Sequence, residues 1–178
     1  MSVSDERLHE VFNFVEPHIE RRYGIPVRIG DVTNPFTGDL DGAEIRIDHE
    51  LSIEEAVFIL AHLFGHTVHW NVSEYARDIG GAVQKNPTEE KLAELAVYER
   101  EACRYSLQLF HEAGVRDLDQ WMADFAACDY AYLRHCYATG EKLPFKSFWK
   151  EGSPLVPLLA IPPFHPQAWV SRWQGVVV

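Results

Sequence analysis

The stretch that most constrains the fold of this chain runs from Ser52 to Trp70, SIEEAVFILAHLFGHTVHW. Ser52 and Glu55 have the spacing of a capping box, which predicts that a helix begins here. Apolar residues occupy nearly all sides of this helix, so it has to be buried rather than half-exposed. We therefore expect the other elements of the chain to pack around it.

Two histidines within this helix predict a metal site. His62 and His66 lie four residues apart, which places both imidazoles on one face, one turn apart. One hydrogen bond suffices to bury a single histidine, but two unpaired imidazoles in apolar surroundings are costly unless something ligates them. Gly65 lies between them. A glycine inside a helix costs about 1 kcal/mol and often marks the close approach of another backbone.

The third ligand is expected from a second long helix, predicted over residues 86–114. Glu99 lies in the apolar stripe of this helix, whereas Glu101 lies on a solvated face. A carboxylate among apolar side chains needs a cation within reach. We therefore assign Glu99 as the third ligand. The alternative is a buried salt bridge from Glu99 to Arg104 or Arg22.

The remaining regular elements predict an α+β protein with a small antiparallel sheet packed against a mainly helical body. Apolar residues at three- and four-residue intervals predict helices, the first of them bent or split by Pro17 and the second capped by Asn86. Alternation with a period of two predicts two strands joined by a turn-rich link. The predicted helices besides the central one cover residues 4–23, 86–114 and 117–138, and the predicted strands cover 25–30 and 43–47.

The length of the chain, 178 residues, is enough for one domain with a self-sufficient core. We expect residues 1–142 to form this domain and residues 143–178 to form a Pro/aromatic-rich arm packed on it. Six of the ten prolines lie between Pro144 and Pro166, next to several aromatic residues. This composition is too aromatic for a disordered tail and too rich in proline for a regular element.

Charge, cysteines and hydropathy exclude several classes of function. With 16 Lys and Arg against 27 Asp and Glu, the net charge of −11 repels a phosphate backbone, so nucleic acid is not expected as a partner. Three widely spaced cysteines argue against a disulfide framework and a cysteine zinc site, which fits a reducing compartment. No stretch resembles a signal peptide or a membrane span, so we expect a cytoplasmic protein without a membrane partner. The oligomeric state stays open.

From about Gly24 to Phe110 the sequence resembles the ImmA/IrrE metallopeptidase domain. The resemblance is carried by AHLFGH, where the family has HExxH, and by EREACRYSLQLF, which is similar to the family's ERxAN helix. It implies a zincin-like (gluzincin) core with zinc held by His62, His66 and Glu99. It also implies zinc-dependent cleavage of peptides, often of a repressor protein, so that a peptide or protein is the expected ligand.

The chain departs from this family at Leu63, where members carry the glutamate that acts as general base. Such a base contributes about 10²- to 10⁴-fold to catalysis, so its loss argues against peptide cleavage by the family's mechanism. Four nearby residues are weak candidates to take part in catalysis instead: His69, Glu101, Tyr98 and Tyr105. His69 lies seven residues after His62 and is expected beside the ligands rather than among them.

These observations support three hypotheses. The first is a zinc-binding, metallopeptidase-like protein that has lost ordinary hydrolysis and binds a peptide or protein, or hydrolyses by the metal alone. The second takes the same three ligands as a two-histidine, one-carboxylate site for Fe²⁺, which suits oxidative chemistry. The third is a scaffold without a metal, in which His62 and His66 only form hydrogen bonds and the aromatic arm is an interaction surface.

Overall fold

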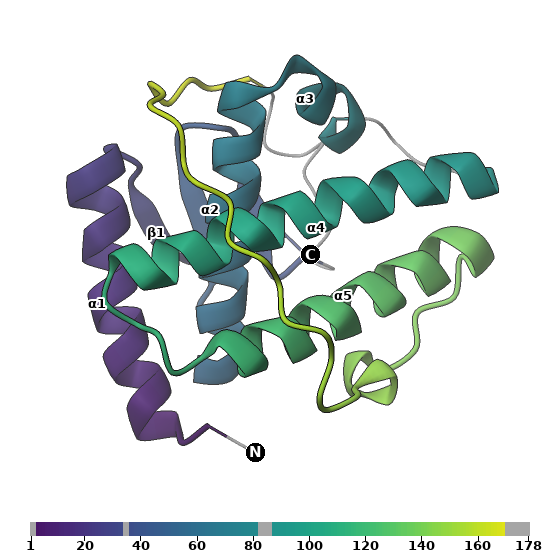
Figure 1. Ribbon diagram of the computed structural model, residues 1–178, viewed down its shortest axis with the longest axis horizontal. Coiled ribbons are helices and arrows are strands. Elements are labelled where there is room, and N and C mark those ends of the chain that lie inside the picture. The colour runs from purple at the N-terminus through teal and green to yellow at the C-terminus, as the bar shows by residue number, and fades with distance from the viewer. Residues whose placement is uncertain (1–2, 34–35, 82–86, 170–178) are drawn as a thin grey trace.

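Helix α2, Ile53–Val72, forms the centre of the molecule. The computed structural model describes residues 3–33, 36–81 and 87–169 (Figure 1). Every residue of α2 from Val57 to Trp70 is buried, which confirms the prediction of a helix enclosed on all sides. The predicted capping box is also present, since the Ser52 hydroxyl accepts from Glu55 N and the Glu55 carboxylate accepts from Ser52 N.

Helix α1, Asp5–Tyr23, packs along α2. The Ser4 hydroxyl caps its first turn, and Gly24 ends it in the left-handed conformation, at φ 68°. A single helix runs through Pro17, so the predicted split at this residue is wrong. Burial of its apolar stripe outweighs the hydrogen bond that proline removes. The buried side chains of this stripe are Leu8, Val11, Val15 and Ile19.

The sheet has three strands and is mixed, so the predicted antiparallel pairing of the two predicted strands is wrong. Strand β1, Val27–Gly30, pairs parallel with β3, Ile45–Asp48. Strand β2, Gly38–Leu40, lies in the predicted turn-rich link and pairs antiparallel with β3, which gives the order β1-β3-β2. A turn at Gly42, φ 98°, reverses the chain between β2 and β3. Strand β3 therefore lies between β1 and β2 and runs parallel to β1.

Helices α4, Glu89–Glu112, and α5, Asp119–Thr139, lie side by side, and α4 packs extensively on α2 (Figure 1). Both were predicted with slightly different ends. The Thr88 hydroxyl caps α4, whereas Asn86, the predicted cap, lies outside the described residues. A short helix, α3, Glu74–Gly80, follows α2 directly in a polar region where the sequence predicts no element.

After α5 the chain forms a 3₁₀-helix, η1, Phe145–Phe148, and then an extended segment over residues 149–169. Residues 170–178 of the predicted arm lie outside the described residues. The extended segment crosses α4 and α5 in Figure 1. Partly buried apolar side chains of this region pack against the core: Phe145, Trp149, Val156, Leu159, Ile161 and Phe164.

Hydrogen bonds attach this crossing segment, residues 149–169, to both helices beneath it. On α5, Asp124 Oδ1 accepts from Ser153 N at 2.8 Å. On α4, the Arg104 guanidinium donates to Pro157 O at 3.1 Å. Ser153, together with Pro154 and Val156, also lines a cavity whose other walls include Glu99 and Cys103. The segment therefore forms one wall of a cavity that the predicted ligand Glu99 also lines.

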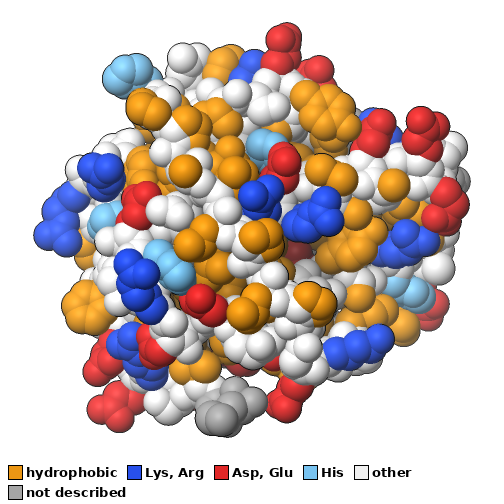
Figure 2. Space-filling model, viewed as in Figure 1, with side chains coloured by type: hydrophobic (Ala, Val, Ile, Leu, Met, Phe, Trp, Pro, Cys, Tyr) orange, Lys and Arg blue, Asp and Glu red, His pale blue; other side chains and the backbone are white. Residues whose placement is uncertain are grey.

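The surface shown in Figure 2 mixes acidic, basic and hydrophobic side chains, and no large patch of a single charge sign is visible on this face. Within the residues that the structure describes, no helix combines the length and the apolar character needed to cross a bilayer.

Candidate metal centre

Three buried side chains meet between α2 and α4, and they are the three predicted ligands. His66 Nε2 lies 3.0 Å from His62 Nε2 and 3.0 Å from Glu99 Oε2. The third distance, from His62 Nε2 to Glu99 Oε2, is 3.2 Å. All three residues are at most 5% exposed. The group is close enough to bind one metal ion.

A close crossing of α2 and α4 brings the three residues together. A Cβ atom built on Gly65 would lie 2.1 Å from Ala102 O, so only glycine fits at this point. The predicted close approach of another backbone is confirmed. Ser106 Oγ donates to Ala61 O at 2.7 Å and ties the two helices beside this contact. Because Glu99 lies one turn before Ala102 on α4, its carboxylate reaches the face of α2 that carries both histidines.

The spacing of the three ligand atoms suits a metal ion. Ligand atoms about 2.0–2.1 Å from a tetrahedral zinc ion lie about 3.3–3.4 Å apart, and the distances observed are 3.0–3.2 Å. Two imidazole nitrogens 3.0 Å apart can share only one proton. His62 Nε2 and His66 Nε2 each also lie close to Glu99 Oε2, so three polar atoms crowd one point. A cation between the three atoms would resolve this close approach, so the residues fit a metal ion.

The site attracts positive charge. Burial lowers the pKa of His62, but Cys103, Glu99 and Asp129 outweigh this effect and hold the pKa well above its ordinary value. Burial alone would raise the pKa of Glu99, but the two imidazoles beside it outweigh burial and lower the pKa to about 2. Burial lowers the pKa of His66, which keeps the imidazole neutral and its lone pair available. The alternative pairing of Glu99 with Arg104 or Arg22 is wrong, because Arg104 bonds the crossing segment and Arg22 lies 3.8 Å from Glu112.

Cys103 contacts Nδ1 of His62, the ring nitrogen that is not the predicted ligand atom. Its Sγ lies 3.5 Å from His62 Nδ1. Burial raises the pKa of the Cys103 thiol, so the sulfur is a neutral partner of the imidazole. When one nitrogen of a histidine binds a metal, the other is usually held by a hydrogen-bonding group that fixes the orientation of the ring. Cys103 occupies that place for His62.

Asp129 is a residue near the ligands that the sequence analysis missed. It lies on α5, is 3% exposed, and places Oδ2 3.7 Å from His62 Nε2. Burial raises the pKa of Asp129 to about 7. The signal was present in the sequence, because Asp129 lies four residues after Phe125, within the inward-facing stripe of α5. A carboxylate in an apolar stripe is the same signal that identified Glu99.

Of the four weak catalytic candidates, Tyr98, Glu101 and Tyr105 gather around the fourth, His69, and Tyr98 also contacts His66. Tyr98 stacks between His66 and His69, with ring centroids 4.6 Å and 5.3 Å away, and its hydroxyl accepts from Trp70 Nε1 at 2.7 Å. Glu101 pairs with His69 at 3.0 Å. The ring of Tyr105 lies 6.0 Å from that of His69. His69 thus lies beside the ligands and is paired with a carboxylate of its own.

The burial of His69 predicts a pH-dependent stability. Burial lowers the pKa of His69 to about 4, so the unfolded chain binds one more proton than the folded chain between pH 4 and 6.5. Stability is therefore present above pH 6.5 and is lost as the pH falls toward 4. In metal-free protein, wild type should lose roughly 2–3 kcal/mol more than His69→Gln between pH 7 and 4.5, as measured by urea unfolding. Equal losses in both proteins would contradict this assignment, and His49→Gln serves as an exposed control.

Leu63, the residue directly after the predicted ligand His62, is fully buried. It packs beneath β2, where its Cδ1 lies 2.6 Å from the position that a Cβ atom on Gly38 would take. The position has therefore become part of the hydrophobic core. The Leu63 side chain forms a packing contact between α2 and the sheet.

Comparison with known proteins leaves the chain without an assigned relative. No protein family, no curated protein and no solved structure matches the sequence or the fold.

Proposed function

We propose that this chain is a zinc-binding protein of the ImmA/IrrE type, which binds a peptide or protein and lacks the family's ordinary hydrolysis. The observation that carries the proposal is the convergence of His62, His66 and Glu99 within 3.2 Å of one another in a buried site. Two histidines and a glutamate are a donor set found in catalytic zinc sites, which keep a further position open for a ligand.

The absence of a carboxylate at position 63 supports a binding protein rather than a peptidase. Zinc would supply Lewis acidity toward a bound carbonyl. The chain's own residues would hold it, with Cys103 orienting His62 and the stacked ring of Tyr98 orienting His66. Leu63 is buried under the sheet and provides no group that accepts a proton. We therefore do not expect residue 63 to act as a general base in hydrolysis.

Iron is the second candidate, and the spacing of the ligand atoms supports it. Neighbouring ligand atoms about 2.1 Å from a six-coordinate metal ion lie about 3.0 Å apart, which is the distance from His66 Nε2 to each of the other two ligand atoms. A site of two histidines and one carboxylate with open positions is typical of Fe²⁺ enzymes that use oxygen. The protein would then be an oxidative enzyme, for which the missing base is no loss.

The metal content of protein purified without added metal tests these proposals. Wild type should carry about one zinc ion per chain, as measured by mass spectrometry of the elements, and His66→Ala should carry almost none, because two remaining ligands bind zinc far more weakly. His69→Ala is the matched control, since His69 lies on the same helix three residues away but is paired with Glu101. It should keep the metal.

Each other outcome selects a different hypothesis. Iron in wild type, lost in His66→Ala, supports the oxidative enzyme. A chain without metal, even after incubation with zinc or anaerobic Fe²⁺, contradicts both metal proposals and favours the metal-free scaffold. Loss of metal in His69→Ala but not in His66→Ala would mean that the ligands have been assigned wrongly.

A further inference from the structure

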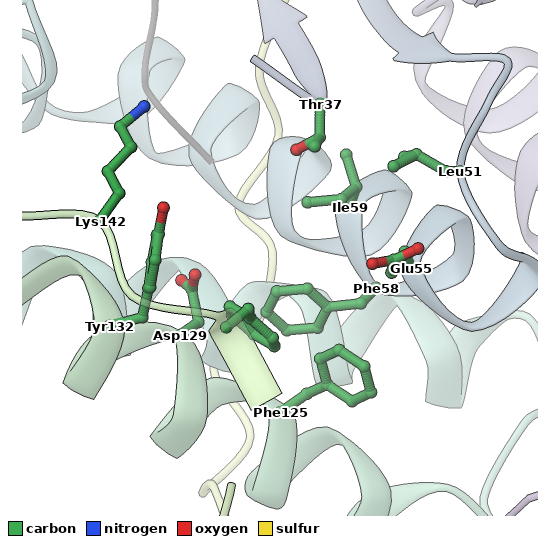
Figure 3. A pocket seen from close by; sticks show the side chains of 10 residues that line it. Thr37, Leu51, Glu55, Phe58, Ile59, Phe125, Asp129, Tyr132 and Lys142 are labelled. Carbon is green, nitrogen blue, oxygen red and sulfur yellow. The ribbon is translucent and has the colours of Figure 1, made fainter. Parts of the chain in front are cut away.

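A small pocket lies between α2, α5 and η1 (Figure 3), and one of its lining residues, Asp129, contacts the predicted ligand His62. Its volume is about 130 Å³, slightly smaller than a cavity that holds a benzene ring. The inner walls are aromatic and aliphatic, from Phe58, Phe125, Phe145 and Ile59, and the outer rim carries Lys142 and Glu55. The pocket therefore has room for one apolar group of about ring size.

Asp129 is the polar group of the inner wall. Figure 3 shows its carboxylate between Tyr132 and Phe58, with the oxygens directed into the pocket. Asp129 is 3% exposed, and its Oδ2 forms an ion-pair contact with His62. A carboxylate on an apolar wall favours a ligand that carries an N–H or O–H donor at this point.

The position of Asp129 connects the pocket to the ligand cluster. Its Oδ2 lies 3.7 Å from His62 Nε2, which is too long for a hydrogen bond. At this distance, a water molecule or a polar ligand atom between the two groups can bridge them by hydrogen bonds. His66 and Glu99 lie within 3.2 Å of the same nitrogen, His62 Nε2. Asp129 is therefore the lining residue that connects the pocket to the predicted ligands.

We infer that this pocket is the ligand-binding site of the proposed metal centre. It takes a compound with one apolar group no larger than a benzene ring, next to an N–H or O–H group that donates to Asp129. The apolar group packs between Phe58 and Phe125, and its polar end faces His62. The inference rests on the proposed function, because it assumes that a metal ion is held by His62, His66 and Glu99.

Two hydroxamic acids test the pocket on the zinc-loaded full-length chain. Benzohydroxamic acid carries a ring next to an N–H and O–H, whereas acetohydroxamic acid has the same polar end and only a methyl group. Isothermal titration calorimetry should show that the benzo compound binds about tenfold or more tightly, since burial of the ring adds apolar area that the methyl group lacks. Equal dissociation constants for the two compounds would overturn the assignment of the pocket.

Filling the pocket provides the matched test. Leu51→Trp and Lys142→Trp place a large side chain at its lining, and both should remove the preference for the ring while acetohydroxamic acid binds as in wild type. Lys142 is exposed, so this second variant keeps the test valid if Leu51→Trp fails to fold. Ile29→Trp is the control, because Ile29 is 60% exposed and lies on β1, outside the pocket. An unchanged ring preference in folded Lys142→Trp contradicts the inference.

Asp129→Ala tests the polar end of the site. It should weaken both hydroxamic acids by about tenfold, the usual effect of losing a hydrogen bond to a charged group, and leave the zinc content unchanged. Loss of zinc in this variant would make Asp129 a metal ligand and overturn the role assigned to it. The outcomes remain distinct from failure of the proposed function, which would appear as absence of zinc from wild type.

Discussion

Gly65→Ala should destabilise the protein by about 3 kcal/mol or more, although the same change in an ordinary helix stabilises it by about 1 kcal/mol. The new Cβ atom would lie 2.1 Å from Ala102 O and 2.6 Å from Ser106 Oγ. Ordinary contact needs more than 3 Å, so α2 and α4 have to separate. Their separation weakens the hydrogen bond from Ser106 to Ala61 and the packing around it.

The same substitution should also weaken metal binding, because α4 carries Glu99 and α2 carries both histidines. Urea unfolding measures the stability, and titration with zinc in the presence of a competing chelator measures the affinity. Gly30→Ala is the control, since a Cβ atom at Gly30 meets no atom within 4 Å. This variant should change stability by less than about 0.5 kcal/mol. A stabilised Gly65→Ala protein would contradict the close crossing of the two helices.

Leu63→Glu, which creates the pattern HExxH, should strongly destabilise the protein rather than produce a peptidase. Leu63 is fully buried and packs against Gly38 of β2. A carboxylate at this place lies in the hydrophobic core, and we expect a loss of about 3–5 kcal/mol in unfolding free energy. Burial would raise the pKa of the new carboxyl, so the loss should be smaller at pH 5 than at pH 8.

Two controls separate charge from shape at position 63. Leu63→Met conserves volume and should cost less than about 1.5 kcal/mol, whereas Leu63→Gln adds polarity without charge and should show no pH dependence relative to wild type. The measurement is urea unfolding of all four proteins at pH 5 and pH 8. A Leu63→Glu protein that is as stable as wild type and cleaves peptides would show that position 63 faces the ligands and not the core.

The ligand group could be predicted because its signal is local. Two imidazoles and a glycine in a helix with no polar face, and a carboxylate in an apolar stripe, are each anomalous within a few residues of sequence. The structure brings His62, His66 and Glu99 together as that argument requires. Asp129 carries the same signal on α5, but only the apolar residues of that helix were used to define its inward face, and so it was missed.

The arrangement of the strands could not be predicted for a different reason. Alternation identifies which residues of a strand are buried, but it does not tell which strand is the neighbour or in which direction it runs. Strand β2 consists of Gly38, Asp39 and Leu40, and glycine and aspartate are rare in strands. Without it, β1 and β3 looked like consecutive neighbours, which are usually antiparallel. Gly38, Asp39 and Leu40 form a strand because they pair with β3, and not because of their own strand propensity.

The position of the crossing segment implies an order of events during synthesis. The three ligand residues lie between positions 62 and 99, and α5 ends at Thr139, so all of them leave the ribosome before Ser153. Ser153, Pro154 and Val156 then close one wall of the cavity that Glu99 lines. A nascent chain whose helices have already packed therefore offers a metal ion a more direct route to Glu99 than the completed protein does. Loading during translation would avoid the need to open the finished fold.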